Sequence, residues 1–196
     1  MKVPRVLLLD VLGTLTYDPF YVEIPEFFGM SLPELLEAKH PSTWVEFELG
    51  TIDERTMLSR YFADGRAVDG VGLKRKMSQS YRLLPGIESL LHELYSHGVP
   101  MHALSNYPSW YQLIEERLEL SRYLRWSFVS CLVGMRKPDP KIYQHVAAEL
   151  GVPTSACLFV DDREDNCEAA RDEGMDAVVF TDASALRRAL VERRVL

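Results

Sequence analysis

The chain has 196 residues, of which 47% are hydrophobic and 26% are charged, so it can bury the core of one large domain or of one domain with an insertion. Its formal net charge of −7 argues against a nucleic-acid or anionic-membrane partner, because phosphate-rich surfaces require clustered Lys and Arg. Its three cysteines, none at zinc-ligand spacing, favour a reducing compartment in which each is a small core residue.

The first element is the apolar run at residues 6–9, which is too short to span a membrane and is typical of a strand buried on both faces of a parallel sheet. Lys2 and Arg5 precede it, but Asp10 interrupts the run too early for a signal peptide. No other segment reaches the length of a transmembrane helix. We therefore expect a cytoplasmic protein, or an organellar one if a transit peptide has been removed.

Residues 17–83 contain almost no β-branched runs and carry several helix signals. These are, in chain order, a capping box of Ser31 and Glu34, a helix start at Ser42 or Thr43 with a stop at Gly50, a cap at Asp53, and an apolar helix face of Leu73, Met77 and Tyr81. They predict an all-helical insert of about four helices.

Helices and strands alternate after residue 84. We expect helices at 87–95, 109–120, 141–150, 165–174 and 184–193, and strands at 99–104, 128–133, 157–160 and 177–180. Such alternation implies a parallel sheet with right-handed crossovers. The predicted fold class is α/β, a doubly wound Rossmann-like parallel sheet with an all-helical cap inserted after strand 1. Residues 1–16 and 84–196 would form the core, and residues 17–83 the cap.

Polar residues follow the predicted strands at the points where those strands end, and the carboxyl ends of parallel strands meet at one edge of a sheet. The groups are Asp10 with Thr14, Ser105 with Asn106, Lys137, and Asp161 with Asp162. Carboxylates crowded in this way repel one another unless a cation lies among them. A hard divalent ion such as Mg2+ suits their oxygen ligands. Asp10 taken alone is equally well explained as a cap of the turn that follows it.

The order of these motifs resembles the haloacid dehalogenase superfamily of aspartyl-nucleophile hydrolases. The matching stretches are Asp-x-x-Gly-Thr at residues 10–14, Ser-Asn at 105–106, Arg-Lys-Pro-Asp-Pro at 136–140 and Val-Asp-Asp at 160–162. The insert resembles the small helical C1-type cap of that family. The resemblance covers nearly the whole chain and implies a Mg2+-dependent phosphatase that acts on a small phosphorylated metabolite through an aspartyl-phosphate.

The same resemblance implies a role for each polar residue. Asp10 would be the nucleophile, Ser105 and backbone amides near Asn106 would bind the phosphoryl oxygens, and Lys137 would neutralise their charge. Mg2+ would be bound by Asp10, the carbonyl of Leu12 and Asp162, with Asp161 binding the ion directly or lying just behind these ligands. Thr14 would support the loop that binds the substrate. Phosphoryl transfer requires positioning and charge stabilisation more than acid–base groups, and this set supplies both. Asn166 either orients the Asp162 loop or caps or packs its own helix.

The chain departs from the family at Leu12, where phosphatases of this family usually carry a second Asp that serves as general acid and base. Loss of such a group costs about 10²–10⁴-fold in rate. Three explanations stay open: a substrate with a good leaving group, a proton from a cap residue or water, or a protein that binds a phosphate ligand without turnover. A 2-haloacid dehalogenase also lacks this Asp, but the Asp161–Asp162 pair favours a metal, which dehalogenases do without.

Further stretches resemble the plant-type flavin mononucleotide (FMN) hydrolases of this superfamily, namely residues 18–21, 25–30 and 106–111. That group also has an apolar residue at the position of Leu12, so FMN becomes the first candidate substrate. Aromatic side chains near a phosphate site can stack on an isoalloxazine ring. We assign most of the aromatics to the core of the cap and its seam, namely Phe20, Phe27, Phe28, Trp44 and Trp110, and we expect the pocket to be lined by Tyr17, Tyr21 and Tyr107.

Overall fold

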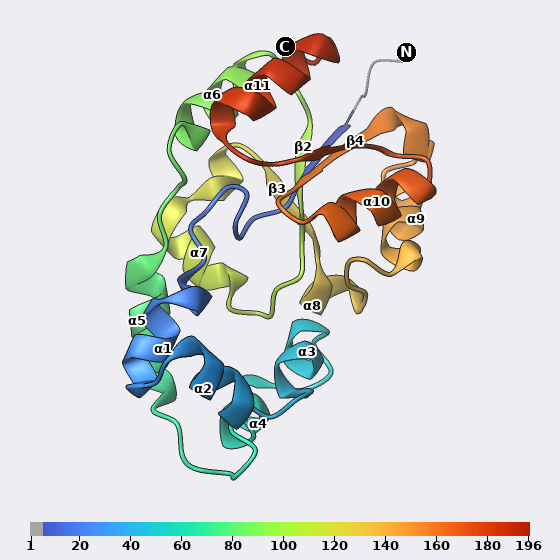
Figure 1. The fold of residues 1–196 in the computed structure, drawn as a ribbon. Coiled ribbons are helices and arrows are strands. Elements are labelled where there is room, and N and C mark those ends of the chain that lie inside the picture. The colour runs from blue at the N-terminus through green and yellow to red at the C-terminus, as the bar shows by residue number, and fades with distance from the viewer. Residues whose placement is uncertain (1–5) are drawn as a thin grey trace.

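A five-stranded parallel sheet in the order β3-β2-β1-β4-β5 lies at the centre of the protein (Figure 1). The structure is a computed structural model that describes residues 6–196; residues 1–5, which include Lys2, Arg5 and the start of the predicted core segment, lie outside the described part. The strands are β1 (Val6–Leu9), β2 (Met101–Ser105), β3 (Arg125–Val129), β4 (Cys157–Asp161) and β5 (Asp176–Val179). The predicted α/β fold class is confirmed.

The register of the three central strands brings their carboxyl ends together. Leu9 of β1 pairs with Ala103 of β2 and with Val160 of β4. The backbone N–H of Asp10 donates to the Val160 carbonyl at 2.9 Å, which continues the ladder beyond β1. Side chains that follow these strands therefore meet at one edge of the sheet, as ligand-binding residues do in open α/β folds.

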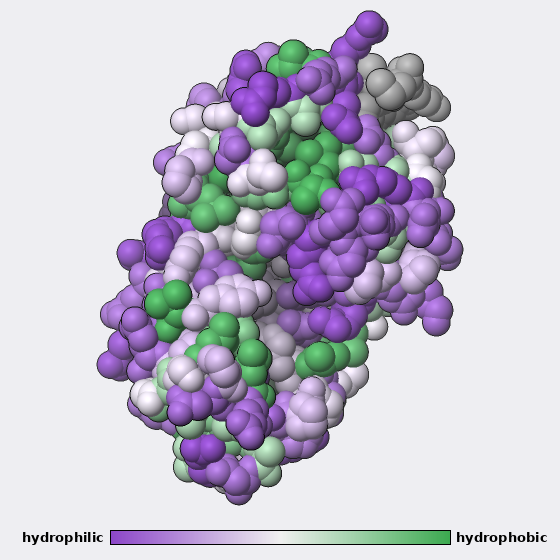
Figure 2. Space-filling view, viewed as in Figure 1, coloured by the Kyte–Doolittle hydropathy of each residue, from purple (hydrophilic) through white to green (hydrophobic). Residues whose placement is uncertain are grey.

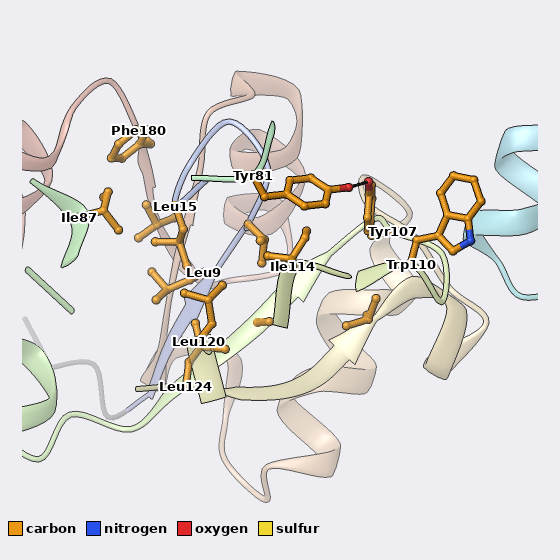
Figure 3. Close-up of a cluster of buried hydrophobic side chains, with 14 of the residues drawn as sticks. Leu9, Leu15, Tyr81, Ile87, Tyr107, Trp110, Ile114, Leu120, Leu124 and Phe180 are labelled. Atoms are coloured by element: carbon orange, nitrogen blue, oxygen red, sulfur yellow. Dashed lines mark hydrogen bonds between the residues drawn. The ribbon is translucent and has the colours of Figure 1, made fainter. Parts of the chain in front are cut away.

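Helices cover both faces of the sheet. In chain order they are α6 (Ile87–Ser96), α7 (Tyr111–Leu118), η2 (Leu120–Arg122), α8 (Ser130–Val133), α9 (Pro140–Glu149), η3 (Thr154–Ala156), α10 (Glu164–Asp172) and α11 (Ala183–Glu192). Alternate side chains of a strand point to opposite faces. Leu7 and Leu9 pack in a core with α6, α7 and α11, part of which Figure 3 shows. Leu8 packs on the other face with α9 and α10.

Residues 17–83, all of which the structure describes, form helical elements and no named strand. These are η1 (Pro19–Tyr21), α1 (Glu23–Phe28), α2 (Leu32–Ala38), α3 (Thr43–Glu48), α4 (Glu54–Ser59) and α5 (Gly70–Ser80). The capping box of Ser31 with Glu34 and the cap at Asp53 are confirmed, since both side chains accept from backbone N–H groups. Figure 1 shows α1–α4 together at one end of the molecule and α6 and α11 at the other.

The segment therefore has five α-helices where the sequence predicted about four. The missed helix is α1, which contains Pro25. This proline lies in the first turn, where a backbone N–H has no partner within the helix, so it does not interrupt the helix. The helix ends at Gly29, whose φ of 65° is left-handed.

The predicted strand at 128–133 is also wrong in its position. The strand ends at Val129, and residues 130–133 turn into the short helix α8. The hydroxyl of Ser130 donates to the Glu48 carbonyl at 2.6 Å and accepts from the Tyr107 backbone N–H at 2.9 Å. These tertiary contacts use groups from distant segments, so local apolar pattern alone could not reveal where the strand stops.

The cysteines agree with the sequence prediction. Cys157 and Cys167 are buried, Cys131 is half-buried, and all three are free thiols. In the part of the chain from residue 6 to residue 196, none of the helices combines the length and the apolar character that crossing a bilayer requires.

The close approach of α3 to α8 generates a stability prediction. Gly50 has a φ of 68°, and a Cβ there would lie 2.7 Å from the Cys131 carbonyl oxygen. Gly29 has a similar φ of 65° but no atom within 4 Å of such a Cβ, so it is a matched control. Both alanine variants carry the left-handed backbone cost of about 1–2 kcal/mol, but only Gly50→Ala adds a steric clash of about 1–3 kcal/mol.

Urea unfolding should therefore show that Gly50→Ala lowers the free energy of unfolding by more than Gly29→Ala does. Equal losses in the two variants would contradict the contact between α3 and α8.

Candidate active site

The ends of β1 and β4 hold an ionic cluster around one lysine. Lys137 is 2% exposed, and its Nζ lies 2.6 Å from Asp10 Oδ1 and 2.6 Å from Asp161 Oδ2. Asp162 follows Asp161 and is exposed, and one carboxylate oxygen from each aspartate lies within 4.8 Å of the others. The structure thus brings together four side chains from three segments that are far apart in the sequence.

Asn106 fixes the backbone on which Lys137 is carried. Its Nδ2 donates to the Lys137 carbonyl, and its Oδ1 accepts from the Lys137 backbone N–H, both at 2.8 Å. The amide side chain is thereby fully engaged with the lysine loop, and its own backbone follows Ser105 at the end of β2. Ser105 is buried and lines the same cavity as Asp10.

Both carboxylate oxygens of Asp161 accept hydrogen bonds. Besides Lys137, it accepts from the Arg163 backbone N–H at 2.8 Å, and the Asn166 amide donates to Oδ1 at 3.1 Å and to Oδ2 at 3.0 Å. Of the two sequence-based readings of Asn166, the contact with Asp161 agrees with a role in holding this loop. Asp10 Oδ2 accepts only a long bond of 3.4 Å from the Thr14 hydroxyl among residues 6–196.

The charges in the cluster do not balance. Burial raises the pKa of Asp10 above its ordinary value, Lys137 opposes this rise, and Asp161 and Asp162 add to it. Burial disfavours the Lys137 ammonium as well, but its two carboxylate partners outweigh burial and raise the pKa of Lys137. Three carboxylates beside one ammonium leave an excess of negative charge in a largely buried site, which a divalent cation would neutralise.

The donor set fits Mg2+. The ion prefers hard oxygen ligands and one or two protein carboxylates together with phosphate oxygens. Asp162 and the Oδ2 side of Asp10 offer such oxygens, and the Leu12 residue lines the same cavity beside them.

A cavity of about 340 Å³ extends from this cluster to the helical residues 17–83. Figure 2 shows the surface hollowed at the junction between these helices and the rest of the molecule. The residues that the helical segment contributes to the lining are Asp18, Phe20, Tyr21, Ile24, Lys39, Trp44, Glu48, Tyr61, Leu73 and Met77. The cavity therefore has an ionic end and an end with several aromatic rings, and its volume is that of a small-molecule site.

Of the three tyrosines predicted to line the pocket, two do so and one does not. Tyr21 and Tyr107 line the cavity, and the Tyr107 hydroxyl is hydrogen-bonded to that of Tyr81 (Figure 3). Tyr17 does not line it; the Tyr17 hydroxyl donates to Glu23 Oε2 at 2.8 Å, and its ring lies 3.6 Å from the Arg82 guanidinium carbon.

The five aromatic side chains that were assigned to the core of the cap and its seam differ in whether they also line the cavity. Phe27 and Phe28 pack within the helical segment, as expected, and are not in the cavity lining. Phe20, Trp44 and Trp110 pack against the core and also line the cavity. Thr14 is fully buried and does not line the cavity, and within residues 6–196 its hydroxyl donates only to Asp10.

Sequence reasoning assigned no role to three charged groups of the helical segment that line the cavity, Asp18, Lys39 and Glu48. The Lys39 Nζ lies 4.6, 5.2 and 5.4 Å from the ring centres of Phe20, Trp44 and Tyr61, and burial lowers the pKa of Lys39 to about 8. Glu48 is 7% exposed and accepts from the Trp44 indole at 2.7 Å and from Arg136 at 2.9 Å. Glu48 lies in the stretch 44–52, which resembles the helical cap of the family, but Lys39 lies in no matching stretch, and only the folded structure places both at the cavity.

Comparisons with known proteins agree with this architecture. A family model described as haloacid dehalogenase-like hydrolase matches residues 4–174. The chain is 46% identical over 189 residues to the chloroplastic flavin mononucleotide hydrolase 1 of Arabidopsis thaliana, covering 96% of this chain and 77% of that protein. It is 31% identical over 165 residues to the sesquiterpene phosphatase astK of Aspergillus oryzae, covering 80% of this chain and 81% of that protein.

Solved structures show the same fold. A HAD family enzyme from Bacteroides thetaiotaomicron, solved with magnesium and inorganic phosphate, superimposes with a TM-score of 0.72 at 19% identity. The match covers 93% of this chain and 98% of that one. At this identity the likeness establishes the fold alone.

The raised pKa of Asp10 predicts how stability depends on pH and metal. Because the folded protein binds a proton on Asp10 more tightly than the unfolded chain does, the ionised carboxylate opposes folding as the pH rises above the ordinary value of 3.8. Without divalent ions, Asp10→Asn should therefore unfold at a higher temperature than the wild type at pH 8, and the difference should shrink toward pH 4.

Magnesium should raise the unfolding temperature of the wild type more than that of Asp10→Asn, because binding to the folded state stabilises it. Thermal unfolding with and without Mg2+ measures both effects. A variant that is less stable than the wild type at pH 8 without metal would contradict this electrostatic description.

Proposed function

The chain belongs to the haloacid dehalogenase-like hydrolases, and we propose that it is a Mg2+-dependent phosphatase that forms an aspartyl-phosphate on Asp10, with FMN as the first candidate substrate. The observation that carries the proposal is the position of Lys137, which lies between Asp10 and Asp161 in the floor of a cavity large enough for a small molecule. A buried carboxylate held beside an ammonium is suited to attack phosphorus while the incoming negative charge is neutralised.

Each residue of the cluster then has a distinct task. Asp10 attacks the phosphorus through one carboxylate oxygen, and the Thr14 hydroxyl orients the other. Lys137 neutralises charge on the phosphoryl oxygens, and Ser105 donates a hydrogen bond to one of them. Asp161 keeps the Lys137 ammonium in position, which its contacts with Asn166 and Arg163 support.

Asp162, Asp10 and the Leu12 carbonyl would hold Mg2+, with Asp161 behind them. The ion supplies positive charge that stabilises the phosphoryl oxygens during transfer. Asp162 is the exposed member of the three aspartates, so its oxygens remain accessible to an ion, whereas those of Asp161 are already engaged by protein donors.

Residues 17–83 act as a cap over a core of residues 1–16 and 84–196. Three bonds across the seam support this assignment. Trp110 Nε1 donates to Glu54 at 2.8 Å, Arg136 donates to Glu48 at 2.9 Å, and the Ser130 hydroxyl donates to the Glu48 carbonyl at 2.6 Å. These bonds hold the helical segment against the core, so that it covers the cavity and would shield a bound phosphoryl group from water.

The distal end of the cavity favours a substrate with a planar ring. Phe20, Trp44 and Tyr61 surround the Lys39 ammonium, so this end offers both apolar ring faces and a hydrogen-bond donor. The isoalloxazine of FMN has a planar ring system with carbonyl acceptors, which suits that combination. The relative at 46% identity, which is named an FMN hydrolase, supports the same choice.

The assay of FMN tests the proposal. The wild type with Mg2+ should release riboflavin and inorganic phosphate, a chelator should abolish the release, and Asp10→Asn should lower the rate by at least about 10³-fold, since it removes the nucleophile. An exposed aspartate outside the cavity, changed in Asp172→Asn, is the matched control and should keep the wild-type rate.

Two outcomes would instead favour the alternatives raised by Leu12. Binding of FMN without release of phosphate, equal in the wild type and in Asp10→Asn, would indicate a protein that binds phosphate ligands without turnover. Release of halide from a 2-haloacid in the absence of metal would indicate a dehalogenase.

A further inference from the structure

Breaking a phosphate ester of an alcohol requires a proton for the departing oxygen, and Leu12 has none to give. Five carboxyl groups line the cavity: Asp10, Asp18, Glu48, Asp161 and Asp162. Asp10 and Asp161 share Lys137, Asp162 is the proposed metal ligand, and Glu48 is bound by Arg136 and Trp44. Asp18 is therefore the carboxyl group that the proposed reaction has not used.

The backbone returns past Leu12 before it reaches Asp18. Leu12 and Thr16 form an isolated β-bridge, and the Gly13 N–H donates to the Thr16 carbonyl at 2.8 Å. Tyr17 is then held by its N–H, which donates to the Arg82 carbonyl at 2.9 Å. This tight loop brings Thr16 beside Leu12 in parallel orientation, and Asp18, two residues after Thr16, lines the same cavity as Leu12.

The Asp18 carboxyl is oriented but not neutralised. Its Oδ1 accepts from the Phe20 N–H at 2.9 Å. Within residues 6–196, no Lys, Arg or His forms an ion pair with Asp18, and no second hydrogen bond reaches the carboxyl group. One oxygen is thus held by the backbone, and the other remains available to a ligand in the cavity.

We propose that Asp18 gives the proton to the leaving oxygen of the substrate and then acts as the base for the hydrolytic water, in the place of the acid that Leu12 cannot supply. This role rests on the proposed phosphatase function. In the first step, the bond from Asp10 to phosphorus forms, the bond from phosphorus to the leaving oxygen breaks, and the Asp18 proton passes to that oxygen. In the second step, water attacks the aspartyl-phosphate, its proton passes to Asp18, and Asp10 and inorganic phosphate are released.

The surroundings of Asp18 favour the protonated form that the first step needs. Burial raises the pKa of Asp18, and the charges of Asp162 and Glu23 add to the rise. The Phe20 N–H and the Lys39 ammonium act in the opposite direction, but they do not outweigh burial. A buried carboxyl group with a raised pKa is the usual form of a general acid at neutral pH.

The simplest competing explanation is that Asp18 only caps η1 through its bond to the Phe20 N–H. Asp18→Asn separates the two roles, because the asparagine oxygen still accepts that bond while the side chain can no longer transfer a proton. Asp53→Asn is the matched control, since Asp53 also caps a helix of the same segment but does not line the cavity.

The test compares kcat/KM for phenyl phosphate, whose leaving group phenol is poor, with kcat/KM for 4-nitrophenyl phosphate, whose leaving group 4-nitrophenol is good. Asp18→Asn should lose about 10²-fold or more on phenyl phosphate but less than about tenfold on 4-nitrophenyl phosphate, because only the poor leaving group needs a proton. The ratio of the two values within one variant does not depend on how much of the protein is folded.

On phenyl phosphate, the double variant Leu12→Asp, Asp18→Asn should be at least about tenfold more active than Asp18→Asn, because it restores a carboxyl group beside the leaving oxygen. Asp53→Asn should keep the wild-type ratio.

Equal losses on the two esters, or no loss, would overturn the role of Asp18. A dependence on the leaving group that appears in Lys39→Met and not in Asp18→Asn would overturn it as well. A wild type inactive on every ester would contradict the proposed function together with this role, whereas an active wild type with an unchanged ratio in Asp18→Asn would overturn the role of Asp18 alone.

Discussion

A buried ammonium between two carboxylates is the constraint on which the rest of the site depends. Lys137 is 2% exposed, so its charge is tolerated only because Asp10 and Asp161 both accept hydrogen bonds from it. Those carboxylates follow β1 and end β4, which are neighbours in the sheet. Buried ion pairs contribute little net stability, because the cost of desolvation offsets the attraction. The cluster is therefore better explained by the chemistry it can perform than by the fold it stabilises.

The same lysine loop also connects the sheet to the helical segment. Arg136 precedes Lys137 and binds the Glu48 carboxylate, while the Glu48 carbonyl accepts from Ser130 at the end of β3. Displacement of α3 would therefore disturb the residue next to the buried ammonium. These contacts tie α3 to the loop that carries Lys137, so the helical segment and the ionic cluster are held in one geometry.

The sequence predicted the features that depend on local pattern and on strand ends. Asp10, Lys137 and Asp161 could be assigned to one edge of the sheet because parallel strands share that edge. The local sequence pattern did not predict element boundaries that depend on contacts between distant segments. The helix α1 was not predicted, and it contains Pro25 in its first turn, where a proline is tolerated. Ser130 ends β3 through bonds to segments that are remote in the chain.

The cavity lining was harder to predict than the ionic cluster. Tyr17 was predicted to line the pocket because it follows the loop of the proposed nucleophile, but its hydroxyl donates to Glu23 and its ring packs against Arg82 instead. Lys39 carries no sequence signal that separates it from ordinary surface charges. Asp18 lies in a stretch that resembles the plant-type hydrolases, but nothing in that stretch singles out its carboxyl group. Their place in the cavity follows from how the helices of residues 17–83 pack over the sheet.

Detection of the covalent intermediate examines the role of Asp10 most directly. The wild type is mixed with FMN and Mg2+, quenched in acid during turnover and digested, and the peptides are analysed by mass spectrometry. We expect one phosphoryl group on the peptide that contains Asp10, and its disappearance once the substrate is consumed. Hydrolysis of FMN with no phosphoryl group on that peptide, under conditions in which an acyl phosphate survives, would contradict this account.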